Sequence, residues 1–538
     1  MRISGAKLTL AVLPVGLFGL SVILTNHHGP YFLHNNFDPD YNYLLNSLSL
    51  LKFHTPGHTD HPGTTLQLLG AAILLLKWLG VSLFVHREPL ADSVLSHPEE
   101  YLRSINIVLN VLIGTTLYWS AWRIYRLSNS LVAALLLQVS MLVYSQTFLA
   151  LFRVSPEPLL LAVGLALMVP LAPMVIRRNG TEEANENRLA IAAGAIFGFG
   201  LITKITFAPW AAVILLFPKR SQKRRFAVAA VTTSVVLLLP VAARLPDMAT
   251  WFSSLLLHSG HYGTGRIGIP EAHVMAANFV SLWRVEPPLF LFLALYAATL
   301  LLLRLLPPRG TPLTDKARPL LLAACIAITA EIMMVVKHPA YHYLLPALVL
   351  TAFVNSAVWV VLPRSELSRT ALRGLPLAGM VVFIGIGLFH NWSSFWWWVG
   401  ATREDRQNIA KLHALEERQP GCQIIGAYRS SLEAYALAFA NGYSAGAHES
   451  TLEKLYPGTI NYDPFHDQFG SFRFGKKDDD VKRLVLNGQC VLMETTPLDA
   501  NALKHFDSIH FATLMTAGNP IIPSDSTTLY RLEPLRVP

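Results

Sequence analysis

The sequence predicts an α-helical polytopic membrane protein, with about eleven transmembrane helices and a small α/β domain at its end. Of its 538 residues, 52% are hydrophobic and only 14% are charged, whereas a water-soluble domain carries roughly 25% charged residues. Apolar runs repeatedly reach the ~20 residues that cross a hydrocarbon core of ~30 Å. From about Asn391 onward the composition becomes polar enough for a soluble domain.

The basic residues set the orientation of the chain. The formal net charge is +9, but Lys and Arg fall mostly in short loops between apolar runs, as the positive-inside rule describes. We therefore expect membrane lipid, and no nucleic acid, as a partner. The first apolar run, Leu8–Thr25, follows Arg2 and Lys7 and lacks a small-residue cleavage site. It reads as an uncleaved first span with a cytoplasmic N-terminus.

The apolar segment Thr64–Phe84 is compatible with two membrane topologies. It is apolar enough to cross, but it contains Lys77 and Gly80. If it crosses, the basic runs WRIYR and PKRSQKRR lie outside; if it lies on the outer surface as a juxtamembrane helix, every basic run is cytoplasmic. We take the second topology. The later spans are then expected at about Leu102–Trp122, Leu131–Leu149, Leu159–Ile176, Leu189–Thr203, Phe207–Phe217, Phe226–Val241, Pro288–Leu306, Pro319–Val336, Tyr343–Leu362 and Leu375–Phe389.

This topology places the C-terminal part outside the cytoplasm. We expect a transmembrane catalytic domain over 1–390, in which 26–101 is the first outer loop with its juxtamembrane helices, and a soluble α/β domain over 391–538. In the soluble part, NWSSFWWWVG is an interfacial aromatic belt, and RQNIAKLHALEERQPG and SLEAYALAFANG are helices. CQIIGAYR is a strand, and KRLVLNGQCVLMET predicts two strands around an Asn-Gly turn. Four or five strands are expected in all.

The three cysteines form no metal-spaced motif, and we expect no metal site. Cys325 lies inside an apolar run and is expected to be inert. Cys422 and Cys490 share the C-terminal part and form a disulfide if that part faces an oxidising compartment; a pair of free thiols is the alternative.

Polar side chains collect on the outer face that this topology defines. Charged groups beside apolar spans are costly, so their presence indicates function. A carboxylate can take a proton from an attacking hydroxyl, and cationic donors can hold a phosphate. The pattern therefore favours a reaction on a lipid-borne substrate at the outer interface. The residues are Asp38, Asp40, Asp60, His61, Arg153, Glu157, His258, His261, Tyr262, Arg266, Lys337, His338 and His342.

Structural roles remain open for each of these groups. FDPDY is also typical of an Asx turn, and HSGHYGTG is also typical of a plain loop. KHPAYHY also fits interfacial snorkelling. Lys204, inside an apolar stretch, is either a structural cation or a contact to a lipid headgroup.

Several short motifs follow one another along residues 1–390. They are Pro39-Asp40-Tyr41, Asp60-His61-Pro62-Gly63 before an apolar helix, a span opening with YLRSINI, Arg153-Val154-Ser155-Pro156-Glu157, the Gly-rich AGAIFGFGLITK that ends at Lys204, and YHYLLP from Tyr341 to Pro346. Their order resembles the GT-C superfamily of membrane glycosyltransferases. The resemblance is to the branch of protein O-mannosyltransferases, aminoarabinose transferases and rhizobial lipopolysaccharide sugar transferases.

The resemblance implies transfer of a sugar, with inversion, from a polyprenyl-phosphate donor to a glycan, lipid or protein outside a bacterial cytoplasmic membrane. It implies no cofactor besides that donor. By position, Asp40 is the base or acceptor-orienting acid, and Asp38 is the only neighbouring acid. Glu157 is a second acid, and Lys204 lies near the lipid phosphate. Asp60 and His61 line the donor phosphate or the acceptor.

The chain departs from the family pattern at three places. Tyr41 stands where the family has a second acid, Gly63 where it has a second proline, and Glu157 where it has aspartate. Two other classes remain as alternatives. A transporter or flippase would carry ionisable groups at span midplanes in two similar halves. A non-catalytic assembly or sensor protein would bind through its C-terminal domain.

Overall fold

The computed structural model describes residues 5–33, 37–60, 62–84, 88–176, 183–260, 263–305, 314–362, 370–417, 421–427, 432–463, 468–472, 478–495, 515–522 and 528–534. The chain divides into two compact units. Unit 1 comprises Met1–Thr25, Thr59–Leu66 and Asn106–Trp396, and unit 2 comprises Asn26–His58, Gln67–Ile105 and Trp397–Pro538. Much of the first outer segment thus belongs to the same unit as the C-terminal residues.

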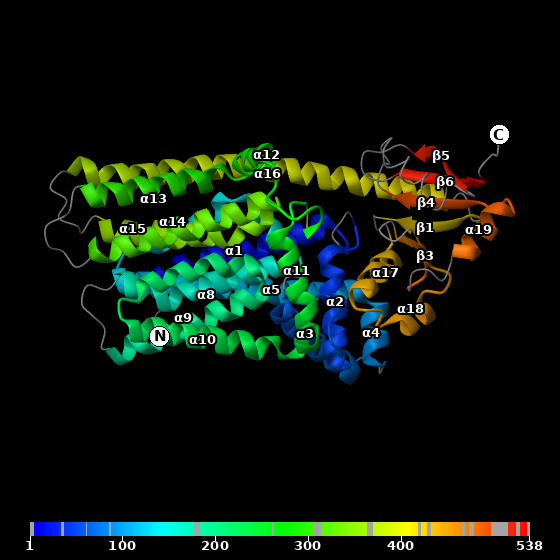
Figure 1. The fold of residues 1–538 in the computed structure, drawn as a ribbon, viewed down its shortest axis with the longest axis horizontal. Coiled ribbons are helices and arrows are strands. Elements are labelled where there is room, and N and C mark those ends of the chain that lie inside the picture. Colours follow the sequence, from blue (N-terminus) through cyan, green and yellow to red (C-terminus); the bar gives the residue numbers. More distant parts are fainter. Residues whose placement is uncertain are drawn as a thin grey trace. The chain divides into compact units, whose positions relative to one another are not determined.

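Unit 1 is helical in its described residues (Figure 1). Three of its helices continue into unit 2: α5 begins there, and α1 and α16 end there. Its helices are α1 (Gly5–His28), α5 (Pro98–Ser128), α6 (Leu131–Ser140), η1 (Met141–Val143), α7 (Ser145–Ala150), α8 (Pro156–Ile176), α9 (Glu183–Thr203), η2 (Ile205–Leu216), α10 (Arg220–Leu238), η3 (Leu239–Arg244), α11 (Leu245–Leu257), α12 (Ala272–Val285), α13 (Pro287–Leu305), α14 (Thr314–Lys337), η5 (Tyr341–Leu344), α15 (Leu345–Val361) and α16 (Thr370–Glu416).

Nine helical stretches among the described residues are long and apolar enough to cross a membrane. They are Gly5–His28, Thr64–Phe84, Pro98–Ser128, Pro156–Ile176, Arg220–Leu257, Pro287–Leu305, Lys316–Lys337, Tyr341–Val361 and Gly374–Lys411. All but Thr64–Phe84 coincide with predicted spans, so the polytopic helical fold is confirmed. Thr64–Phe84 is a 21-residue helix, and its placement on the outer surface stays a prediction.

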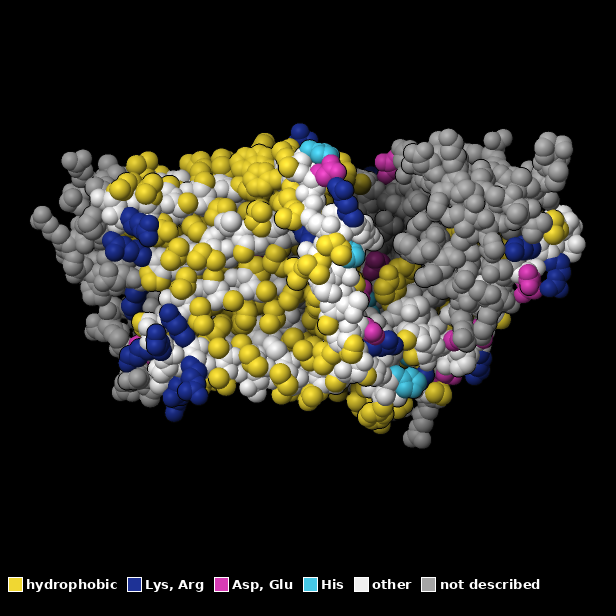
Figure 2. All heavy atoms as spheres, in the orientation of Figure 1, with side chains coloured by type: hydrophobic (Ala, Val, Ile, Leu, Met, Phe, Trp, Pro, Cys, Tyr) yellow, Lys and Arg dark blue, Asp and Glu magenta, His cyan; other side chains and the backbone are white. Residues whose placement is uncertain are grey.

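Burial separates central helices from peripheral ones. The apolar windows of Pro156–Ile176 and Tyr341–Val361 are 89% and 94% buried, whereas that of Arg220–Leu257 is only 17% buried. Exposed Val228, Val231 and Val235 lie on α10, where a soluble protein would place polar residues. Figure 2 shows the broad hydrophobic surface of unit 1, with Lys and Arg side chains at one end of its helices. This is the surface expected of helices that face lipid.

Small residues allow α9 to approach α10 closely. Gly194 and Gly198 are one helical turn apart, and a Cβ atom there would lie 2.1 Å from the Phe226 carbonyl oxygen and 2.4 Å from that of Ala230. A close contact between glycine-bearing faces is how many membrane helices associate without a hydrophobic driving force.

Three predicted segments are corrected. Leu131–Leu149 is not one helix but α6, η1 and α7, separated at Tyr144, which has extended dihedral angles. The predicted span Leu375–Phe389 does not end at Phe389, because α16 is one helix of 47 residues that runs on through the aromatic belt. The predicted span Phe226–Val241 is part of a longer helical run that continues through η3 and α11.

The described residues of unit 2 contain a mixed sheet and, besides the parts of α1, α5 and α16 that lie in it, six helices. Its further helices are α2 (Phe37–Leu51), α3 (Thr64–Phe84, whose first three residues belong to unit 1), α4 (Leu90–Ser96), α17 (Glu433–Tyr443), α18 (Glu449–Leu455) and α19 (Asp478–Leu486). Its strands are β1 (Gln423–Ala427), β2 (Ile460–Asp463), β3 (Gln468–Gly470), β4 (Val491–Thr495), β5 (Met515–Ile522) and β6 (Thr528–Pro534).

The six strands form one sheet in the order β3-β2-β1-β4-β6-β5. β1 is parallel to β2 and β4, while the other pairs are antiparallel. Cys422 and Cys490 directly precede the neighbouring strands β1 and β4, and they form a disulfide; of the two outcomes left open by the sequence, this is the one observed. Cys325 carries the free thiol among the described residues.

The expected pair of strands around the Asn-Gly turn is wrong in its first half. Residues 478–486 form helix α19, and only the second half becomes a strand, β4. Val481 and Val485, one helical turn apart, are both buried against the sheet. Two buried valines at that spacing favour a helix over a strand.

The Asn35–Gly80 stretch is largely helical, because α2 and α3 occupy most of it. Within unit 2, α2 packs against α17. Asn46 organises the connection that follows: its side-chain oxygen accepts hydrogen bonds from the backbone N–H of Gly57 (2.7 Å) and His58 (3.1 Å). His448 contacts Ser49 and the Leu45 carbonyl oxygen through Nε2, at 3.0 Å each.

Candidate functional site

Lys204 sits where the chain breaks between α9 and η2. Its dihedral angles are extended (φ −162°, ψ 139°), and its backbone still bonds to both sides, through its N–H to Gly200 and its carbonyl to Phe207. The side chain is 2% exposed. The predicted break at this residue is confirmed, and it turns a lysine side chain into the interior of unit 1.

Glu157 lies in the first turn of α8, directly after Pro156. Proline is favoured at the first helical position, and an acid is favoured in the first turn because helix dipoles point their positive end there. Lys204 forms a buried ion pair with its carboxylate. Removing one member of such a pair leaves an uncompensated charge, which is strongly destabilising.

His342 and Tyr343 complete this group from η5. His342 Nε2 lies 3.8 Å from a Glu157 carboxylate oxygen, and its side chain is 49% exposed. The Lys204 ammonium lies 4.1 Å from the centre of the Tyr343 ring. We call Glu157, Lys204, His342 and Tyr343 the lysine cluster. His342 is its exposed member, whereas the carboxylate and the ammonium are buried.

The lysine cluster and Arg153 carry more positive than negative charge. Arg153 is within electrostatic range of His342, and its carbonyl oxygen accepts a hydrogen bond from Asn106 at 3.2 Å. The lysine cluster and its immediate surroundings thus contain two permanent cations, an imidazole and one carboxylate. Such an arrangement attracts an anion, and a phosphate oxygen can accept hydrogen bonds from all three donor types.

Two buried residues hold the segment that carries His342 and Tyr343. Trp210 in η2 donates its indole N–H to the Pro346 carbonyl oxygen at 3.1 Å, and Glu331 in α14 accepts the Ala347 N–H at 3.0 Å. Both contacts fall in the first turn of α15, directly after η5. The two halves of the lysine cluster are therefore fixed to one another through packed helices.

Asp38 and Asp40 belong to unit 2, at the start of α2. Asp38 has extended dihedral angles, and its carboxylate accepts a hydrogen bond from the side-chain amide of Asn42 at 3.0 Å. Asp40 is fully buried. The adjacent Tyr41 donates its hydroxyl to Glu99 at 2.7 Å. Asp40 thus lies in a rigid, enclosed turn.

Asp60 lies in the connection between α2 and α3, and burial raises the pKa of its carboxyl group. Three of the residues predicted from the sequence, His61, His261 and Tyr262, lie outside the described residues. The buried His58 was not singled out by the sequence. Its ring lies between those of Tyr43 and Tyr443, with centroids 5.4 and 5.5 Å away.

His258, Arg266 and His338 gather around the end of α11. His258 forms a β-bridge with Ile267, and Arg266 lies 3.8 Å from Glu271. His338 Nε2 lies 3.2 Å from the Leu255 carbonyl oxygen. Lys337 donates to the Leu256 carbonyl oxygen at 2.5 Å. Cations at the C-terminal carbonyls are a common way to end a helix, so these contacts have a structural explanation.

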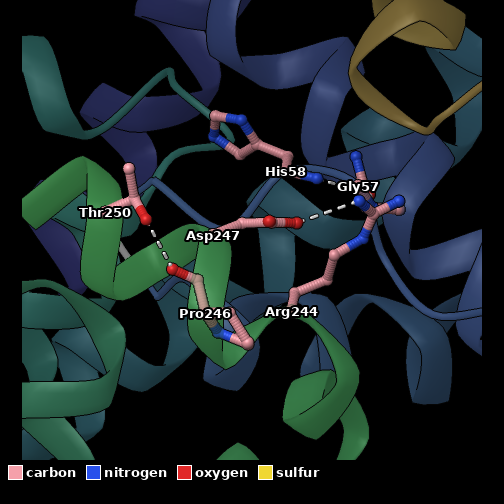
Figure 3. A network of polar contacts seen from close by, with 7 residues as sticks. Gly57, His58, Arg244, Pro246, Asp247 and Thr250 are labelled. Atoms are coloured by element: carbon pink, nitrogen blue, oxygen red, sulfur yellow. Dashed lines mark hydrogen bonds and ion pairs between the residues drawn. The ribbon is translucent and has the colours of Figure 1, made fainter.

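The N-terminal end of α11 is also held by contacts between residues that are close in sequence. Arg244 pairs with Asp247 at 3.1 Å, and the Thr250 hydroxyl donates to the Pro246 carbonyl oxygen at 3.0 Å (Figure 3). Both ends of this short helix are thus held by its own neighbours.

Sequence reasoning missed Tyr343, Trp210, Glu331 and Glu99 as contributors. Tyr343 was quoted within a motif but given no role. Glu331 could have been found from the sequence, because an acid inside an apolar run needs a partner. Glu99 and Glu100 were read only as a polar stretch before a span.

The chain was compared with known proteins. No family model matches it, and a search of curated proteins finds no match. Two solved structures are similar: ArnT from Cupriavidus metallidurans bound to undecaprenyl phosphate and the same protein in the apo state. For the first, the TM-score is 0.49 and the identity 13%, with 97% of each chain covered. For the second, the TM-score is 0.49 and the identity 12%, with 96% of this chain and 97% of that chain covered.

The chain is similar to ArnT along nearly its whole length. ArnT is an aminoarabinose transferase, one of the branches that the sequence motifs resemble. At this identity and TM-score the likeness concerns the course of the chain, so we argue function from the side chains.

Proposed function

We propose that this chain is a membrane glycosyltransferase that takes its sugar from a polyprenyl-phosphate donor and transfers it, with inversion, to an extracytoplasmic acceptor. The acceptor is a glycan, lipid or protein, and the enzyme lies in a bacterial cytoplasmic membrane with its C-terminal domain in the periplasm. The motifs that resemble the GT-C superfamily support this proposal.

The observation that carries the proposal is the lysine cluster. Lys204 is paired with Glu157, the half-exposed His342 lies beside that pair, and Arg153 is within electrostatic range of His342. A lipid-linked phosphate matches both the charge of this group and its apolar surroundings. In the transfer step the bond between the sugar and the phosphate breaks, and these donors would stabilise the charge that develops on the phosphate.

Asp40 is the proposed base. It would take the proton of the acceptor hydroxyl as that oxygen attacks the anomeric carbon, while the polyprenyl phosphate leaves on the opposite face of the sugar.

The test is sugar transfer in isolated membranes that contain the wild-type chain or Asp40→Asn. The asparagine is nearly isosteric, and Asp92→Asn, in the neighbouring helix α4, serves as the control. We expect transfer to fall at least a hundredfold for Asp40→Asn, as is usual for loss of general base catalysis, and to be unchanged for the control. Normal transfer by Asp40→Asn at normal protein level would remove Asp40 from the mechanism.

A transporter is the second candidate, because a buried Lys–Glu pair inside apolar helices is also typical of proton-coupled carriers. Uptake of polyprenyl-phosphate sugar into vesicles without any transfer to an acceptor would favour it.

A further inference from the structure

The position after Asp40 holds Tyr41 where the related family has an acid, and the structure brings an acid to it from another helix. The Tyr41 hydroxyl donates to Glu99 Oε1 at 2.7 Å. Glu99 is 58 residues further along the chain, in the first turn of α5. Both residues belong to unit 2.

Glu99 also binds the chain before α2. Its Oε2 accepts the Tyr31 N–H at 2.8 Å, and its Oε1 accepts the Phe32 N–H at 3.2 Å. A single carboxylate therefore joins the segment after α1, the first turn of α2 and the first turn of α5. Three donors on one charged group hold it more firmly than neutral hydrogen bonds would.

Tyr41 is suited to stay a donor. It is fully buried, and burial, together with the charge of Glu99, raises the pKa of its phenol well above its usual value. The hydroxyl therefore keeps its proton at every physiological pH. Because Asp40 precedes Tyr41 in the first turn of α2, the Tyr41–Glu99 bond fastens the turn of backbone that carries the Asp40 carboxylate.

We propose that Glu99 is a positioning residue for Asp40, and that through Tyr41 it takes the place of the acid missing from the sequence motif. This inference rests on the proposed function. A purely structural role is the competing explanation, since Glu99 also ties three segments together. The two differ in what they change: a positioning role lowers the rate of the chemical step, whereas a structural role lowers only the amount or stability of folded protein.

The experiment measures kcat and KM for sugar transfer by purified wild type, Tyr41→Phe, Glu99→Gln and the double variant. Phenylalanine keeps the ring and loses only the hydroxyl, and glutamine keeps an oxygen for the backbone donors. Glu100→Gln is the matched control, because Glu100 is the next residue, is 68% exposed and pairs with Lys77 at 3.2 Å. Melting temperature is recorded for each variant.

We expect Tyr41→Phe and Glu99→Gln each to lower kcat about tenfold, with KM and melting temperature nearly unchanged. The double variant is expected to be no slower than the slower single one, because both substitutions act through the same Tyr41–Glu99 hydrogen bond. The Glu100→Gln control keeps wild-type kcat.

Wild-type kcat in Tyr41→Phe, or strictly multiplicative losses in the double variant, would overturn the positioning role. If Glu99→Gln does not fold, Tyr41→Phe alone decides. A wild type that transfers no sugar at all contradicts the proposed function, and with it this inference, whereas an active wild type with a normal Tyr41→Phe contradicts the inference alone.

Discussion

The Lys204 ammonium lies 4.1 Å from the centre of the Tyr343 ring while it pairs with the Glu157 carboxylate. An aromatic face stabilises a cation without consuming its hydrogen-bond donors. The ring and the carboxylate thus stabilise the same ammonium in different ways. Variants of Lys204, Glu157 and Tyr343 can therefore separate the stability of this cluster from the binding of a ligand.

Replacing Lys204 is expected to affect both properties. Lys204→Met leaves Glu157 buried without its cation, which costs about 3–5 kcal/mol of stability. Adding Glu157→Gln removes that charge, so the double variant is expected to melt close to the wild type and still fail to bind undecaprenyl phosphate in native mass spectrometry. Lys77→Met is the control, because Lys77 pairs with the largely exposed Glu100. Wild-type affinity for undecaprenyl phosphate in the double variant would show that Lys204 does not bind the lipid phosphate.

Tyr343 is expected to act through its ring. Tyr343→Phe keeps the aromatic face, and we expect it to bind undecaprenyl phosphate as the wild type does. Tyr343→Leu removes the face and should weaken binding about tenfold, since a desolvated cation–π contact contributes about 1–2 kcal/mol. Equal affinities of the phenylalanine and leucine variants would exclude this contribution.

Glu331 is expected to support the site from a distance. Glu331→Gln keeps an oxygen for the Ala347 N–H, whereas Glu331→Leu has none, so only the leucine variant should lower transfer, by about tenfold. If the effect passes through His342, it should vanish in a His342→Ala background. Independent, multiplicative losses would instead mean that Glu331 acts on the fold as a whole.

His448 gives unit 2 a sensitivity to acid. Its Nε2 must carry the proton that it shares with the Leu45 carbonyl oxygen, and burial lowers the pKa of this histidine to about 4. Between about pH 6.5 and pH 4 the unfolded chain binds a proton that the folded chain does not, so stability falls as the pH is lowered through this window. The loss reaches on the order of 3 kcal/mol at the acid end.

The predicted loss of stability at low pH can be measured with melting curves of the purified chain between pH 7.5 and pH 4. His448→Gln should flatten the pH dependence, whereas His273→Gln, at an exposed position, should leave it as in the wild type. A slope that persists in His448→Gln would assign it to other groups.

Long apolar runs predicted most of the helices, because a run that reaches ~20 residues has few other solutions in a membrane. The break at Lys204 was also predictable, since a lysine interrupts an apolar stretch there. The break within 131–149 was not. The segment contains no charged residue, proline or glycine that would mark a break. The start of α7 is held by Glu286, whose carboxylate accepts the Ser145 hydroxyl at 2.6 Å and the Gln146 N–H at 3.2 Å. That partner lies 140 residues away from Gln146.

The candidate site, too, could be predicted only in part from the sequence. Glu157, Lys204 and His342 were each found from sequence, because charged residues beside apolar spans are conspicuous. Their direct pairing depends on how α8, η2 and η5 pack, which no local pattern encodes. The acid at Glu99 was missed for a related reason: a motif is read along the chain, and here the carboxylate that contacts Tyr41 comes from another helix.

The most direct test of the proposed function is the lipid-linked sugar content of a bacterial strain that lacks this chain. We expect the strain to accumulate a polyprenyl-phosphate sugar and to carry a surface glycan, lipid or protein that lacks one sugar. The wild-type gene should restore both, and the gene carrying Asp40→Asn should restore neither. A deletion strain with unchanged lipid-linked sugars and unchanged surface sugars would contradict the assignment as a glycosyltransferase.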